Sequence, residues 1–198
     1  MPVRPPRLAL RKELARSIRS GHPWVYRDAL RSPAEPLADG TVVEVTSRDG
    51  RATLGWGYWD ARSTIAVRLL GAGTSPPGAG ARTVVSERLG KALARRLSRL
   101  DPAHTNTFRW VHGEADKLPG IHLDLYDDAA AVRFDGDGAR AFYRELEAMI
   151  RAAQTPKPVT RVVDREHRAA GTVAVVREND VVFEVDLGAG GKGGLFLD

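Results

Sequence analysis

The chain has 198 residues, 42% hydrophobic and 28% charged, which is enough apolar material for one large domain or two small ones. No apolar run approaches the ~20 residues that span a bilayer, and the arginine-rich start has no hydrophobic stretch like that of a signal peptide. We therefore expect a cytoplasmic protein with no membrane partner. The complete lack of cysteine excludes disulfides, thiolate metal ligands and a cysteine nucleophile.

The net charge of +5 is unevenly distributed. Residues 1–31 hold eight basic against two acidic residues, whereas the chain from residue 101 onward holds 12 basic and 17 acidic ones. A basic first half suits a polyanionic partner, because Lys and Arg that neutralise phosphates release condensed counterions. Taken alone, the charge fits a solvated surface equally well.

The first part of the chain is predicted to hold short strands and one helix. Residues 12–20 predict a helix with Leu14 and Ile18 on its apolar face, Arg16 and Arg19 elsewhere, and Gly21 as its stop. Short segments rich in β-branched or aromatic residues predict strands at 7–10, 24–26, 41–47, 53–60 and 63–70. Strands at this spacing favour a small β-barrel.

The segment GAGTSPPGAGAR (71–82) has no large apolar side chain and cannot build a core. We predict a linker at residues 72–82 that separates a domain of residues 1–71 from a domain of residues 83–190.

The second domain is predicted to be an α+β layer. It opens on an amphipathic helix at 84–100, with Leu89, Leu93, Leu97 and Leu100 on one stripe. Two strand segments, one helix and three further strands follow at 108–114, 121–134 (broken at Asp127-Asp128), 139–153, 160–166, 172–178 and 181–187. Asn179-Asp180 predicts a hairpin turn between the last two strands.

Few residues fall into catalytic or metal-binding patterns. His112 and Glu114 alternate on one strand, but the five His lack paired-ligand spacing, so no metal site is expected. Gly188, Gly190 and Gly193 fit GxGxxG, yet a dinucleotide site needs a helix and an acidic residue ~20 positions further on. A flexible loop is the better interpretation, and we assign no catalytic residue.

Aromatic residues gather in the first part. Trp24 and Tyr26 alternate beside Gly21-His22-Pro23, and three of the four Trp lie in the first 59 residues. Aromatic side chains amid positive charge suit base stacking. The alternative is that Trp24 and Trp56 fill the core of the barrel.

Three blocks resemble a known family. GHPWVYRDAL (21–30) with GWGYWDARSTIAVRLL (55–70) resembles the PUA domain that opens class I S-adenosylmethionine-dependent methyltransferases acting on cytosine C5 of large-subunit ribosomal RNA. FRWVHGEADKLPGIHLDLYDD (108–128) is similar to the second block of that family, and GKGGLFLD (191–198) to its Lys-Thr-Gly-x-Phe-Leu-Asp segment. The blocks cover essentially the whole chain in the family order.

The resemblance implies an α+β protein in which a PUA-like β-barrel precedes an α+β connecting domain, with the Rossmann catalytic domain absent from this chain. It places His22 and Trp24 in the turn after the basic helix and Arg68 in a later barrel strand. Together with the charge and aromatic patterns, this predicts an RNA-binding set comprising Lys12, Arg16, Arg19, His22, Trp24, Tyr26 and Arg68. It also implies an interdomain set comprising Arg109, Glu114, Asp116, Pro119, Gly120 and Asp124. These acidic residues either pair with basic residues of a catalytic domain or stabilise a local turn.

Two departures from the family pattern bear on chemistry. Gly193 stands where the family has Thr, and the sequence ends before the catalytic domain with its cofactor-binding glycines and cysteine. Methylation at cytosine C5 requires a nucleophile to add at C6, for which a thiolate is suited. We expect no cofactor in this chain, S-adenosylmethionine in a longer parent, and a link to the parent's catalytic domain at residues 191–198.

The favoured function is therefore the RNA-binding portion of such a methyltransferase, with structured RNA, above all ribosomal RNA, as partner. A freestanding PUA-type RNA-binding protein is the main alternative, and a small enzyme using Asp and His residues of 112–128 is less favoured. A homodimer is compatible with either.

Overall fold

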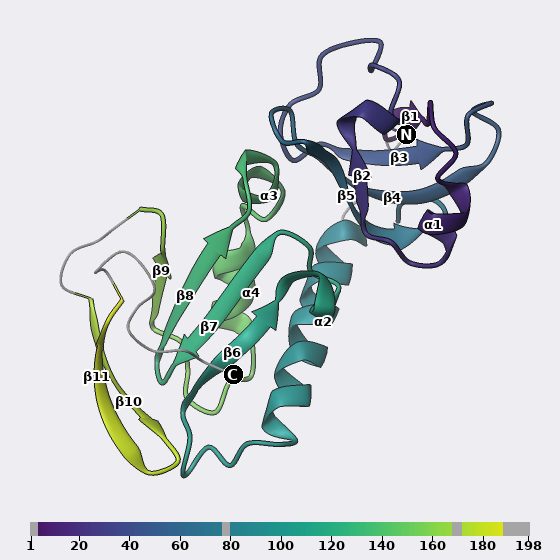
Figure 1. Cartoon of the computed structure of the whole chain (residues 1–198). Coiled ribbons are helices and arrows are strands. Elements are labelled where there is room, and N and C mark those ends of the chain that lie inside the picture. Colours follow the sequence, from purple (N-terminus) through teal and green to yellow (C-terminus); the bar gives the residue numbers. More distant parts are fainter. Residues whose placement is uncertain (1–3, 77–79, 168–171, 188–198) are drawn as a thin grey trace. The chain divides into compact units, whose positions relative to one another are not determined.

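The computed structural model describes residues 4–76, 80–167 and 172–187 (Figure 1). The chain forms two compact units. Unit 1 comprises Met1–Val85 and Phe134–Arg144, and unit 2 comprises Ser86–Arg133 and Glu145–Asp198. The Gly-rich tail and residues 191–198 lie outside the described residues.

Unit 1 is built on a five-stranded sheet that curls into a barrel. Its strands are β1 (Arg7–Ala9), β2 (Trp24–Tyr26), β3 (Val42–Thr46), β4 (Thr53–Trp59) and β5 (Ile65–Ala72), in the order β1-β3-β4-β5-β2. Leu10 and Leu30, just beyond the two outer strands, form an antiparallel bridge, and the Arg11 amide donates to the Ala29 carbonyl at 2.8 Å. These bonds join the two edges, as the predicted barrel requires.

The barrel core explains much of the aromatic pattern. Val25, Val43 and Val67 are fully buried, and Trp59, which is 5% exposed, packs in the same cluster. Trp56 is also buried, at 4% exposed, but it lies beside its register partners Glu44 and Gly71 rather than in that cluster. The residue between Trp56 and Tyr58 has to be a glycine, because a Cβ on Gly57 would lie 2.0 Å from the Arg68 carbonyl oxygen of β5.

A short helix from the second half of the chain belongs to unit 1. The predicted helix at 139–153 is two helices, α3 (Asp137–Phe142) and α4 (Leu146–Ala152). The Phe142 ring stacks on buried Tyr58 at 4.8 Å, and the Gly138 amide donates to the Asp60 carboxylate at 3.1 Å. The boundaries predicted at residues 71 and 83 therefore do not coincide with those of the compact units.

Unit 2 contains a four-stranded sheet and a hairpin. The sheet has the order β6-β7-β8-β9, with β6 (Thr107–His112), β7 (Ile121–Tyr126), β8 (Ala129–Phe134) and β9 (Arg161–Asp164). β8 and β9 are parallel, so the chain crosses over between them through α3 and α4. The break at Asp127-Asp128 is confirmed, with Asp127 at φ 55°.

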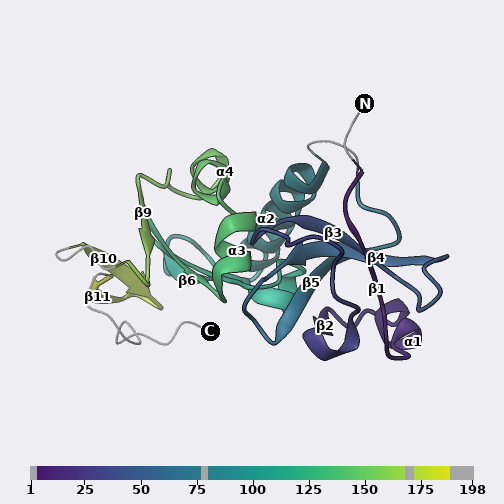
Figure 2. The same cartoon turned by 90° about the horizontal axis from the view of Figure 1, so that it is seen from above.

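The hairpin pairs β10 (Val173–Glu178) with β11 (Val181–Asp186). Asn179 and Asp180 have φ of 49° and 68°, which confirms the predicted two-residue turn, since a type I′ turn needs positive φ at both positions. Figure 2 shows this hairpin beside the four-stranded sheet.

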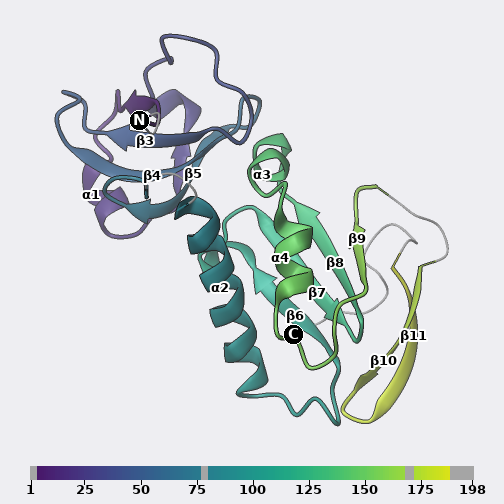
Figure 3. The ribbon, with the colours of Figure 1, turned by 180° about the vertical axis from the view of Figure 1, so that it is seen from behind.

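The two faces of the four-stranded sheet differ. Helix α2 (Gly80–Leu97) and α4 lie on one face (Figure 3), where Leu89 and Leu93 are buried and the Trp110 indole donates to the Leu89 carbonyl at 3.0 Å. On the other face, the hairpin packs on Tyr126, Ala129 and Ala131 through Ala174, Val176 and Val185. Polar side chains of β6 and β7 occupy the rest of that face, where they can meet a ligand.

Candidate nucleic-acid interface

A basic helix stands on the outside of the barrel. Helix α1 (Ala15–Arg19) is shorter than predicted, and Gly21 at φ 96° follows it. Ile18 is 5% exposed and faces the core, while Lys12, Arg16 and Arg19 are exposed, as the predicted apolar face requires. Lys12 forms an ion pair with exposed Asp28, and such surface pairs contribute little. The cations can therefore exchange solvent for phosphates.

Aromatic rings follow this helix directly. Val25 of β2 is fully buried, so its neighbours Trp24 and Tyr26 point away from the core. Tyr26 is 43% exposed, and the half-buried Trp24 meets the exposed His22 ring edge-on, with centroids 6.0 Å apart. Basic side chains and partly exposed rings thus occupy one continuous stretch, residues 12–26, which we call the basic-aromatic segment.

Arg68, the remaining member of the predicted RNA-binding set, is buried. It is 7% exposed, its register partners are Trp24 and Tyr58, and its guanidinium donates to the Asp135 carbonyl at 3.4 Å. A buried guanidinium engaged within unit 1 does not present itself to a phosphate. The surface that we propose below therefore omits Arg68.

The acidic block of the second half is organised around Asp116. A short 3-10 helix, η2 (Gly113–Asp116), places its carboxylate, with 1% side-chain exposure, against two arginines of α2. Arg96 donates to both carboxylate oxygens at 2.6 and 2.7 Å, and Arg95 and the His112 amide add bonds of 3.1 and 2.7 Å. Burial opposes ionisation, but the bonds from Arg96 and His112 outweigh it and hold the pKa of Asp116 below its ordinary value.

Asp124 forms a second such centre in unit 2. It faces its register partner Arg109 across β6 and β7, forms an ion pair with it, and lies 3.1 Å from a guanidinium nitrogen of Arg165. The Asp124 side chain is 4% exposed. Both aspartates thus have arginine partners in their own unit, which gives the local alternative a physical basis.

The other members of the interdomain set shape the turn between β6 and β7. Glu114 is half-buried, and Pro119 and Gly120 are buried. Gly120 at φ 80° and Lys117 at φ 58° take left-handed conformations that reverse the chain. An interdomain role for the whole set stays a prediction.

Sequence reasoning named Arg109, but it missed the other arginine partners of these aspartates. Arg95 and Arg96 lie in the last turn of α2, and Arg165 follows β9, all more than 15 residues from the carboxylates that they contact. No spacing rule joins residues so far apart in sequence, and only the packing of α2 and β9 on the sheet brings them together.

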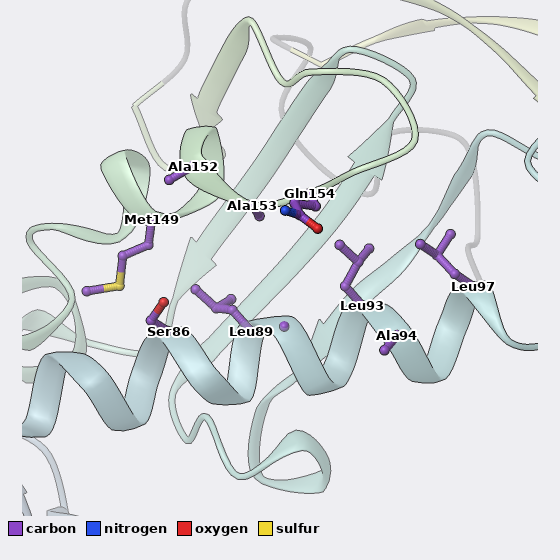
Figure 4. A pocket seen from close by; sticks show the side chains of 10 residues that line it. Ser86, Leu89, Leu93, Ala94, Leu97, Met149, Ala152, Ala153 and Gln154 are labelled. Carbon is purple, nitrogen blue, oxygen red and sulfur yellow. The ribbon is translucent and has the colours of Figure 1, made fainter.

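An apolar groove of about 380 Å³ separates α2 from α4 (Figure 4). Leu89, Leu93, Leu97 and Met149 line it together with Gln154 and small residues, and no charged side chain contributes. Such a lining does not suit RNA. In the described ranges, no group of three His, Asp or Glu is arranged to hold a metal ion, and no helix is long and apolar enough to cross a membrane.

Comparison with known proteins places the barrel in a described family. Residues 8–71 match the PUA-like domain. The chain is 30% identical to "Ribosomal RNA large subunit methyltransferase I" of Alteromonas mediterranea, over 92% of this chain and 49% of that protein. It is also 30% identical to "Ribosomal RNA large subunit methyltransferase" of Deinococcus radiodurans, over 98% of this chain and 52% of that protein.

Solved structures agree on the fold. A Streptococcus mutans protein assigned to the SAM-dependent methyltransferases superposes with a TM-score of 0.74 at 18% identity, over 97% of this chain and 51% of its own. The chain thus carries a PUA-like domain. It is homologous along nearly its whole length to proteins named ribosomal RNA large subunit methyltransferases, and it spans about half of their length.

Proposed function

We propose that this chain is the RNA-binding and substrate-positioning N-terminal portion of a SAM-dependent 23S rRNA (cytosine-C5) methyltransferase. The observation that carries the proposal is the basic-aromatic segment on a PUA-like barrel. Lys12, Arg16 and Arg19 are exposed there beside the partly exposed rings of His22, Trp24 and Tyr26. Such a surface contacts phosphates through its cations and unpaired bases through its rings.

S-adenosylmethionine belongs, in this proposal, to the longer parent, where it supplies the methyl group. In the described part of the chain, Gly136 and Gly138 lie where β8, a strand of a parallel pair, leads into α3. The Asp60 carboxylate already accepts the Gly138 amide there, and α3 has only six residues. The described residues do not fit the cofactor, so no step of methyl transfer is assigned to them.

The freestanding RNA-binding protein remains the second candidate function, because the same basic-aromatic segment would serve it. The two candidates differ in what the parent reading frame encodes. A continuation into a strand, a glycine-rich turn and a later cysteine supports the methyltransferase, and a stop codon directly after Asp198 supports the freestanding protein.

RNA binding is tested with a matched pair of double variants. Arg16→Glu/Arg19→Glu reverses two charges on α1, and Arg48→Glu/Arg51→Glu reverses two exposed charges on the β3–β4 loop, which gives the same net charge. Filter binding to transcribed 23S rRNA at several salt concentrations gives affinity and salt dependence. We expect the α1 variant to lower the salt slope by roughly 2, about one per lost phosphate contact, and the loop variant to change it less.

Equal losses in the two double variants would show that net charge alone drives binding and would contradict the α1 assignment. No binding by the unmodified chain at low salt would overturn the proposed function itself. Thermal unfolding of both variants controls for folding, and we expect it to be unchanged because all four side chains are exposed.

A further inference from the structure

A small polar pocket opens on the face of the four-stranded sheet away from α2 and α4. It measures about 50 Å³, the volume of a few water molecules. Its lining comes from β6, β7, β8 and the residue after β9, and consists of Arg109, His122, Asp124, Arg133 and Arg165. Three of these five side chains are guanidinium groups and one is a carboxylate.

Asp124 holds two of the three guanidinium groups in place. It binds Nε and Nη2 of Arg109 and pairs with Nη2 of Arg165 at 3.1 Å. The same Arg165 nitrogen donates at 2.5 Å to the hydroxyl of Tyr126, which is fully buried. Burial, followed by the Asp124 charge, raises the pKa of Tyr126 and keeps this acceptor neutral. Both guanidinium groups are therefore fixed before any ligand arrives.

The fixed groups keep donors for a ligand. A guanidinium carries five N–H donors. Within the described ranges, Nη1 of Arg109 and both Nε and Nη1 of Arg165 have no acceptor. The side chains of Arg109 and Arg165 are 27% and 24% exposed, so solvent or a ligand reaches them. Arg133 is more exposed than either and adds a third guanidinium at the rim.

The Asp116 centre shows what a closed version of this arrangement looks like. There, Arg96 donates hydrogen bonds to both carboxylate oxygens, and Arg95 and the His112 amide donate further bonds. The Asp116 side chain is only 1% exposed, so no ligand can reach it. At Asp124, in contrast, the carboxylate is part of the lining of an open pocket. Convergent guanidinium groups with spare N–H donors suit a tetrahedral oxyanion, which accepts paired bonds from the arginine fork.

We propose that the pocket of Arg109, Arg133 and Arg165 binds one phosphate group of the RNA backbone. This inference rests on the proposed function and extends it to unit 2, which in net charge is the acidic half of the chain. The pocket is too small for a base, so it contributes affinity and register with no sequence readout. The neighbouring His112 and His122 rings, with centroids 5.4 Å apart, extend the polar surface along β6 and β7.

The binding test uses the whole chain and transcribed 23S rRNA. Arg133→Gln removes the rim guanidinium while the Asp124 pairs stay, and Arg99→Gln removes an exposed charge just beyond α2 as the matched control. We expect Arg133→Gln to weaken binding about tenfold and to lower the salt slope by about 1, with a smaller change for Arg99→Gln. Arg133→Lys should lie between wild type and Arg133→Gln, because it keeps the charge and loses the fork.

A second measurement reports on the pocket itself. Inorganic phosphate titrated into the ¹⁵N-labelled chain should shift the side-chain Nε–H resonances of Arg109 and Arg165, and Arg133→Gln should weaken that response. RNA binding that responds to Arg16→Glu/Arg19→Glu but not to Arg133→Gln, with no phosphate-dependent shifts, would overturn the pocket and leave the proposed function standing. Phosphate-dependent shifts with unchanged RNA affinity would also overturn it, in favour of an acidic protein segment as ligand.

Discussion

The two units use arginine in opposite ways. On the barrel, Arg16 and Arg19 of α1 are exposed, and Ile18 is the one buried residue of that helix. In the sheet unit, buried carboxylates at Asp116 and Asp124 orient Arg96, Arg109 and Arg165. The first arrangement gives exposed cations that can adapt to a polyanion, and the second gives oriented cations that suit a defined geometry.

Net charge therefore says little about which surface can bind an anion. The chain from residue 101 onward has more acidic than basic residues, yet its sheet presents three arginines around one carboxylate. Asp116 and Asp124 are buried and orient arginines, and the charges of these same arginines compensate theirs. What matters is how the charges are distributed between the interior and the surface.

The largest effect that this comparison predicts is on stability at Asp116. Asp116→Ala leaves Arg96, whose side chain is 18% exposed, without its carboxylate, and should lower the free energy of unfolding by about 3 kcal/mol. Because the pKa of Asp116 is lowered from 3.8, its contribution is present above that pH and is lost as the pH falls further. Urea unfolding at neutral and acid pH measures both effects.

The control is Asp137→Ala, which removes a carboxylate with 58% side-chain exposure from a 3.8 Å surface pair with Arg62. We expect a change within about 0.5 kcal/mol. An equal change in the two variants would show that Asp116 is no more than a surface charge.

A smaller loss is expected where α3 joins the barrel. Phe142→Ala removes a ring stacked on Tyr58 and should lower the stability of unit 1 by about 2 kcal/mol, since Phe142 is only half-buried. Hydrogen exchange in β4 peptides should speed up in this variant and stay unchanged in the exposed neighbour Arg144→Ala. Unchanged protection in Phe142→Ala would mean that α3 is not part of the barrel's cooperative unit.

The contrast between the two kinds of arginine is sharpened by lysine replacements. Arg96→Lys keeps the charge but cannot make the paired bonds to Asp116, so we expect a loss of about 1 kcal/mol. Arg16→Lys on exposed α1 should change stability by less than about 0.5 kcal/mol. Thermal unfolding of both variants measures the difference, and similar midpoints would remove the distinction between oriented and exposed arginines.

Much of the fold follows from local patterns in the sequence. The strand at 24–26 and the turn at Asn179-Asp180 are predicted residue for residue, because alternation and turn chemistry are local. The split of 139–153 into α3 and α4 is not, since it depends on Phe142 reaching Tyr58, far away in sequence. For the same reason, sequence reasoning finds Asp116 and Asp124 but not Arg96 or Arg165, and it does not foresee that Arg68, a member of the predicted RNA-binding set, is buried.

The smallest predicted effect lies at the tip of the β10–β11 hairpin. His104 contacts Asp180 at 2.8 Å, and this hydrogen bond, with the Asp180 and Asp101 charges, raises the pKa of His104 above 6.5. The pair therefore stabilises the fold fully below pH 6.5 and less as the pH rises through the raised pKa.

Asp180→Asn removes the charge but suits φ 68°, because Asn readily adopts left-handed conformations. In an NMR titration the pKa of His104 should fall toward 6.5 in this variant, while the hairpin resonances stay in place. An unchanged pKa would show that the pair does not form in solution. The loop before β6 would then be held to the hairpin by its other bonds, which are those of Asn106 and Arg177 and those that the Asn179 and Asp180 amides donate to Thr105 Oγ1 and the His104 carbonyl.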